Sequence, residues 1–146
     1  MGLDQWVAIR GEEEPIGYWR KHPDLHGWMD ELWRRKRWKT LADSLGSAEA
    51  VKDFFRRQSE AIRKYYLGEA TAEEAGIFNQ VELPLTEQDI LHCMEAIRRD
   101  ALPETSGFFF GESDQTEEQR QEDLAIMEKC LGAVRQGKEV VYSSWW

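Results

Sequence analysis

Side chains that can bind an anion and stack on a flat ring gather near residue 20. The chain runs Tyr18-Trp19-Arg20-Lys21-His22 and then reaches His26. A planar guanidinium matches phosphate or carboxylate oxygens, and lysine adds a point charge. Tyrosine and tryptophan rings give a base a stacking face, at about 1–3 kcal/mol per base. The pattern indicates a site for a small anionic ligand, although aromatic stripes and charge runs more often form core and solvated surface.

A second cluster is a phenylalanine run bracketed by glycines, in the segment LPETSGFFFG at residues 102–111. Glycine on both sides lets the backbone turn sharply or approach a ligand. Thr105 and Ser106 supply hydroxyls, and Phe109 supplies a stacking face. The alternative is an edge strand whose phenylalanines fill the core, because alternate strand residues face opposite ways.

The third cluster is the end of the chain, Tyr142-Ser143-Ser144-Trp145-Trp146. A terminus frays unless it is tied down, and each large aromatic ring offers roughly 150–250 Å² for burial. We therefore expect a docked strand here, with Tyr142 and Ser144 on one face and Ser143 and Trp145 on the other.

Catalytic motifs are missing from the sequence. It contains no GxSxG elbow, P-loop or GxGxxG. Cys93 and Cys130 form no CxxC and suit buried free thiols, and three histidines are few for a zinc site. We predict a protein that is not an enzyme and uses neither a metal nor a cofactor. An enzyme with His26 as general acid or base is the alternative, since His26 borders the apolar stripe of its helix.

Hydrophobic spacing and capping residues predict four helices. They begin near Pro23, Ser47, Thr86 and Thr116, and the last three end near Gly68, Pro103 and Gly137. Strands are predicted at 6–9, 77–83 and 139–145, with the phenylalanine run as a possible fourth. The order predicts an α+β fold in one domain, residues 1–146, with about four helices packed on a small antiparallel sheet.

The net charge of −9 is unevenly distributed. Residues 1–67 carry 13 Lys/Arg against 11 Asp/Glu, whereas residues 68–146 carry 6 against 17. An acidic chain is a poor binder of duplex nucleic acid, but a local basic pocket still suits a small anion. No apolar run is long enough to span a membrane, and the first residues lack signal-peptide character, which together predict a cytoplasmic protein.

The three clusters together resemble, in the same order, a widespread family of small phage and prophage proteins. The segments that carry the resemblance are GYWRKHPDLHGWM, LPETSGFFFG and YSSWW. It covers about residues 16–38 and 102–146 and is weak through 39–85. The resemblance implies a relation to phage immune-evasion sponges, which bind cyclic nucleotide signals of host anti-phage defence and do not cleave them.

Under that resemblance the protein acts in the host cytoplasm as a homo-oligomer, because symmetric ligands often sit between symmetric protomers. Cationic side chains would hold the phosphates, aromatic rings the bases, and hydroxyls and His26 the base edges or ribose. The implied ligand-binding residues are Tyr18, Trp19, Arg20, Lys21, His26, Thr105, Ser106, Phe109, Tyr142 and Trp145.

A competing hypothesis is a protein-binding inhibitor or adaptor. Its docking surface would be either the basic helix that contains Phe54, Phe55, Arg56 and Arg57 or the acidic C-terminal half. Small acidic phage proteins can imitate nucleic acid and block its binding sites.

Overall fold

The computed structural model describes residues 2–105 and 116–146. Within them the fold is α+β, with five helices, four of which have at least seven residues, and a four-stranded antiparallel sheet. The predicted fold class is therefore confirmed. The chain divides into two compact units: a sheet unit of residues 1–29 and 82–146, and a helical unit of residues 30–81. The expectation of one domain stays a prediction.

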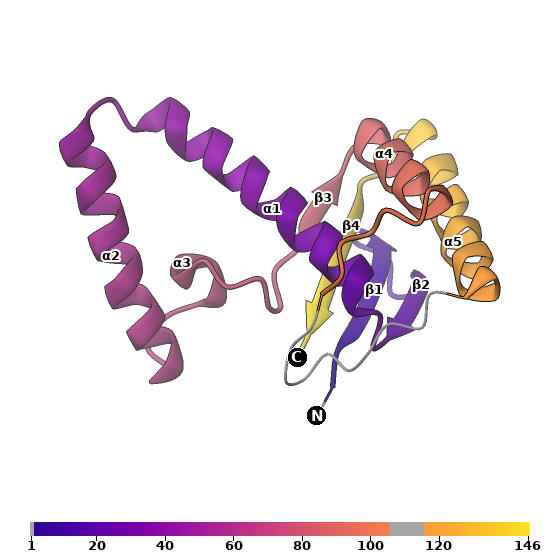
Figure 1. The fold of residues 1–146 in the computed structure, drawn as a ribbon, viewed down its shortest axis with the longest axis horizontal. Coiled ribbons are helices and arrows are strands. Elements are labelled where there is room, and N and C mark those ends of the chain that lie inside the picture. The colour runs from indigo at the N-terminus through magenta and orange to yellow at the C-terminus, as the bar shows by residue number, and fades with distance from the viewer. Residues whose placement is uncertain (1, 106–115) are drawn as a thin grey trace. The chain divides into compact units, whose positions relative to one another are not determined.

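The end of the chain forms a central strand of the sheet. The strand order is β2 (Pro15–Arg20), β1 (Asp4–Ile9), β4 (Val140–Trp145), β3 (Leu83–Leu85) (Figure 1). β4 pairs with β1 from Val140 to Trp145 and with β3 on its other side. The docked tail strand is confirmed, because β4 pairs with β1 along its whole length and with β3 from Val140 to Tyr142.

Two strand predictions differ from the structure. β2 lies where the sequence predicted no strand, at the first cluster, and it forms a hairpin with β1. The strand predicted at 77–83 is wrong for most of its length, because β3 begins only at Leu83 and runs through Pro84 to Leu85. A proline is tolerated there because β3 is an edge strand and needs no ladder donor on its outer side. The possible strand in the phenylalanine run lies outside the described residues.

The helices of the sheet unit begin where their capping residues predict. α4 (Glu87–Arg98) starts with a capping box formed by Thr86 and Asp89. α5 (Glu117–Arg135) follows Thr116, whose hydroxyl accepts from the Gln119 amide at 3.1 Å. Their apolar faces and the start of α1 (Pro23–Ser44) build one core with the inner face of the sheet. Its members include Val7, Leu25, Met29, Leu83, Ile90, Ile97, Met127 and Val140.

The helical unit contains the rest of α1, α2 (Ala48–Tyr66) and the short α3 (Ala72–Ala75). Ser47 caps α2 as predicted, since its hydroxyl accepts from the Ala50 amide. α1 continues to Ser44 and includes the four consecutive cationic residues Arg34 to Arg37. Trp33 stacks on Phe78 with ring centroids 5.1 Å apart. Among the described residues, no helix is both long and apolar enough to cross a membrane.

Candidate functional site

Strand register brings residues of the first and third clusters onto one face of the sheet. Asp4 of β1 lies opposite Arg20 on one side and opposite Trp145 on the other. Directly opposed strand residues share a face, and neighbouring strands lie about 4.8 Å apart. Arg20 and Trp145 therefore flank Asp4 in one row, with backbones roughly 10 Å apart. Both side chains are exposed, and that of Trp145 has 56% of its surface accessible.

The next row of the same face adds two more aromatic rings. Trp6 pairs with Tyr18 on one side and with Ser143 on the other. Tyr18 is 52% exposed, and its hydroxyl donates to Asp4 Oδ1. That hydrogen bond to Asp4 is the main reason why the pKa of Tyr18 is raised. We call Asp4, Trp6, Tyr18, Arg20 and Trp145 the outer-face cluster.

Sequence reasoning missed Asp4 and Trp6 as members of this cluster. The signal was present in the period-two alternation of β1, where Leu3, Gln5 and Val7 are buried and the residues between them are not.

Lys21 lies next to Arg20 and adds a second cation. Its backbone has a positive φ of 57°, and its amide donates to the Leu3 carbonyl at 2.7 Å. Lys21 Cε and Arg20 Nη2 lie 3.1 and 3.7 Å from the position that a Cβ on Gly2 would take. The two cationic side chains thus lie close together above Gly2. Arg20, Lys21 and Asp4 together carry one net positive charge.

Trp19 is buried on the opposite face of the sheet. Its indole Nε1 donates to Asp123 Oδ1 at 2.8 Å, and His22 Nε2 contacts Asp123 Oδ2 at 2.7 Å. Gln119 donates to the same carboxylate at 2.9 Å. The Trp19 ring packs in the core, so this arrangement leaves it no open face for a base.

His26 and Tyr142 belong to the same interior. The Tyr142 hydroxyl lies 2.9 Å from His26 Nδ1 and accepts from Gln5 Nε2 at 3.0 Å. Gln5 Oε1 in turn accepts from the His22 amide at 2.9 Å. Burial lowers the pKa of His26 to about 4, so the imidazole is neutral at neutral pH. A ligand on the protein surface does not reach either ring.

Thr105 connects the second cluster to the first. Its amide donates to Asp24 Oδ1 at 2.9 Å, and its hydroxyl donates to the Pro103 carbonyl at 2.9 Å. It packs on Gly27 of α1, where an added Cβ would lie 1.9 Å from Thr105 Oγ1. Ser106 and Phe109 lie outside the described residues, so their predicted roles are not placed.

Substitution of Gly27 by alanine is expected to lower the free energy of unfolding by about 1–3 kcal/mol, because the methyl group overpacks against Thr105. Gly132→Ala in α5 is the matched control, since an added Cβ there meets nothing within 4 Å. The control should be neutral or stabilising by up to about 1 kcal/mol. Urea denaturation measures both; equal effects would contradict the packing of Thr105 on Gly27.

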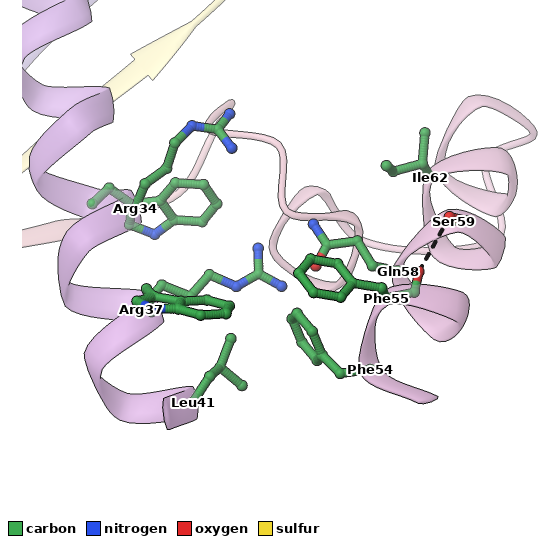
Figure 2. Close-up of a pocket in the computed structure, with 10 residues that line it drawn as sticks. Arg34, Arg37, Leu41, Phe54, Phe55, Gln58, Ser59 and Ile62 are labelled. Carbon is green, nitrogen blue, oxygen red and sulfur yellow. Dashed lines mark hydrogen bonds between the residues drawn. The ribbon is translucent and has the colours of Figure 1, made fainter. Parts of the chain in front are cut away.

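A second candidate site lies within the helical unit, between α1 and α2 (Figure 2). It is a pocket of about 510 Å³ lined by Trp33, Arg34, Arg37, Trp38, Leu41, Phe54, Phe55, Gln58, Ser59 and Ile62. The guanidinium carbons of Arg34 and Arg37 lie 5.8 and 5.4 Å from the Trp33 ring centroid. Trp38 stacks on Phe55 at 6.3 Å.

Sequence reasoning assigned Phe54 and Phe55 to a basic docking helix but did not predict this pocket. The amphipathic spacing of α2 was its sequence signal, and that spacing does not show which residues of α1 face α2 across a pocket.

Other reactive groups are poorly placed for chemistry. Burial raises the pKa of Cys130 to about 12 and also raises that of Cys93, so neither thiol ionises readily. In the described part of the chain, no three His, Cys, Asp or Glu side chains are grouped so that they could hold a metal ion.

Comparison with protein-family models, with curated proteins and with solved structures finds no match to this chain.

Proposed function

We propose that this protein binds a small anionic nucleotide at the outer-face cluster and holds it without chemical change, as a sponge for a cyclic nucleotide signal of host anti-phage defence. The supporting observation is the strand register that places the exposed residues Arg20 and Trp145 on one face of the sheet. The two residues are far apart in the sequence and come from two of the three motif segments.

The cluster offers the two kinds of contact that a nucleotide uses. Arg20 and Lys21 present cationic groups to phosphate oxygens above Gly2, and Trp145 presents an exposed ring to a base. Asp4 repels an anion, but it is occupied by the Tyr18 hydroxyl and is outnumbered by the two cations. The phosphate is therefore expected on the Arg20 and Lys21 side of the row.

Binding without catalysis agrees with the placement of the reactive groups. His26 lies in the interior and is neutral at neutral pH, and both thiols are buried. A cyclic dinucleotide with two identical nucleotides and linkages has two equivalent halves, so a homo-oligomer with ligand between two outer faces is part of this proposal.

Replacement of Arg20 or Trp145 by alanine should weaken nucleotide binding about 10-fold or more each, because a charge-assisted contact or a stacking face is lost. Isothermal titration with a panel of cyclic di- and trinucleotides measures the affinity. Lys129→Ala and Tyr66→Ala are matched controls, since they remove an exposed cation and an exposed ring elsewhere and should bind normally.

Ligand recovered after denaturation of the protein should be chemically intact. If no member of the panel gives a heat of binding, and circular dichroism confirms that the protein is folded, nucleotide binding is refuted. Cleaved ligand would favour the enzyme hypothesis, and full affinity in both Arg20→Ala and Trp145→Ala would exclude the outer-face cluster.

The second candidate function, a protein-binding adaptor, is favoured by a separate observation. α2 contains no buried residue, although one of its faces is apolar. This surface belongs to the helical unit and does not involve the outer-face cluster.

A further inference from the structure

α2 has an apolar face that the described part of the helical unit leaves uncovered. Phe54, Phe55 and Ile62 line the pocket from α2, and Phe55 is 53% exposed. Trp38, which faces them from α1, is 50% exposed. Amphipathic helices gain most of their stability in proteins by burying such a face, and contiguous exposed apolar surface commonly marks an interaction site.

The charge of the pocket lining identifies the chemistry of a suitable partner. Two arginines and no acidic residue are among the ten described residues that line it. Arg34 has a partner in Asp30 at 2.9 Å. Arg37 has no carboxylate of the described residues within 4.0 Å, and its side chain reaches between the helices towards Phe55 and Gln58 (Figure 2). A carboxylate placed beside Arg37 would supply the missing counter-charge.

The electrostatic environment of Arg37 also favours a carboxylate beside it. Burial and the neighbouring Arg34 guanidinium lower the pKa of Arg37, and only Glu73 raises it. An anion in the pocket would stabilise the charged guanidinium.

We propose that the groove between α1 and α2 is the docking site for an acidic amphipathic helix of a partner protein. Apolar anchors of that helix, at i, i+3 or i+4 and i+7, would insert between Trp38 and the Phe54–Ile62 side of α2. A Glu or Asp on its flank would pair with Arg37.

A helix suits this surface better than a small ligand or a second copy. The apolar residues of α2 extend from Phe54 to Ile62, more than two turns, so a small ligand in the pocket would leave much of the face exposed. A second copy of α2 would bring five Lys/Arg and three Asp/Glu to a lining that is already cationic, which like-charge repulsion disfavours.

The test uses a pair of synthetic 18-residue helical peptides with the same leucine anchors. One carries Glu and the other Lys at the flanking positions. Titration into the full chain, followed by fluorescence anisotropy, should show 1:1 saturable binding of the Glu peptide and at least 10-fold weaker binding of the Lys peptide. The Arg37→Glu variant should reverse that preference, and Trp38→Ala should weaken binding of the Glu peptide about 10-fold.

Arg35→Glu is the matched control, because Arg35 is exposed on the same helix but does not line the pocket. It should keep the preference for the Glu peptide, and thermal melting monitors the fold of each variant. An unchanged preference in Arg37→Glu, or an equal change in Arg35→Glu, would overturn the proposal.

Two further results would assign the groove to another occupant and also overturn the proposal. One is self-association of the free chain that Phe55→Ser abolishes in analytical ultracentrifugation. The other is competition between a cyclic dinucleotide and the Glu peptide. Nucleotide binding at the outer-face cluster should be the same in Arg37→Glu as in the natural chain, so the two proposals can fail separately.

Discussion

Replacement of Asp123 by alanine is expected to lower the free energy of unfolding by about 3–5 kcal/mol. Asp123 is only 1% exposed, and its carboxylate accepts from Trp19, His22 and Gln119 at 2.7–2.9 Å. Its loss leaves buried donors without an acceptor, and an unsatisfied buried polar group costs about 1–3 kcal/mol. Domains of this size are usually stable by about 5–15 kcal/mol, so this loss is a large part of the total.

Glu122→Ala is the neighbouring control, because Glu122 is exposed on the same helix. A surface change of this kind usually stays within about 0.5 kcal/mol. The free energy of unfolding of Asp123→Asn should fall between those of Asp123→Ala and Glu122→Ala. Asparagine keeps one acceptor oxygen, but it presents an amide N–H₂ group where His22 needs a second acceptor oxygen. Guanidinium denaturation measures all three variants, and an Asp123→Ala midpoint close to that of Glu122→Ala would show that the buried network contributes little.

Acidification should destabilise the protein through His26. Burial lowers the pKa of His26 from its ordinary 6.5 to about 4, so the unfolded chain binds the proton more readily between these values. This contribution to stability is complete above pH 6.5 and is lost as the pH falls from about 6.5 to 4. A full shift of this size corresponds to about 3 kcal/mol.

The measurement is the free energy of unfolding of the natural chain and of His26→Gln between pH 4 and 7.5. Glutamine does not titrate and can keep the hydrogen bond to Tyr142, so the variant should lose this part of the pH dependence. Carboxylates that titrate in both proteins cancel in the difference. Parallel curves for His26→Gln and the natural chain would mean that His26 is not held neutral by the core.

Local signals predicted the helices well because capping is a local interaction. Ser47, Thr86 and Thr116 each accept from a backbone amide three residues later, as their spacing indicated. The strand β4 was also predictable, because Val140, Val141, Tyr142 and Trp145 are residue types that favour strands. β2 was missed because its identity depends on pairing with β1, which no local pattern shows.

The resemblance to the phage family stays a hypothesis, but the structure gives its motif residues a physical role. Trp19, His26 and Tyr142 share one buried hydrogen-bonded interior, and Thr105 is tied to Asp24 beside it. Much of what looked like a ligand site in the sequence therefore holds the sheet unit together. Aromatic and polar side chains serve both purposes, and only burial separates the two.

The sequence by itself determined the fold class, the starts of the four longer helices and the docked tail strand, since these follow from capping, periodicity and the burial of apolar rings. The start of the short helix α3 was missed, although Thr71 and Glu74 form a capping box there. Tertiary structure alone decided which motif residues face water. The strand register aligns Asp4 with Arg20 and with Trp145, and it places these side chains on the outer face of the sheet. The same register places Trp19 and Tyr142 in the core. It also decided that the apolar faces of α1 and α2 enclose a pocket, because amphipathic spacing marks a face for burial without identifying what covers it.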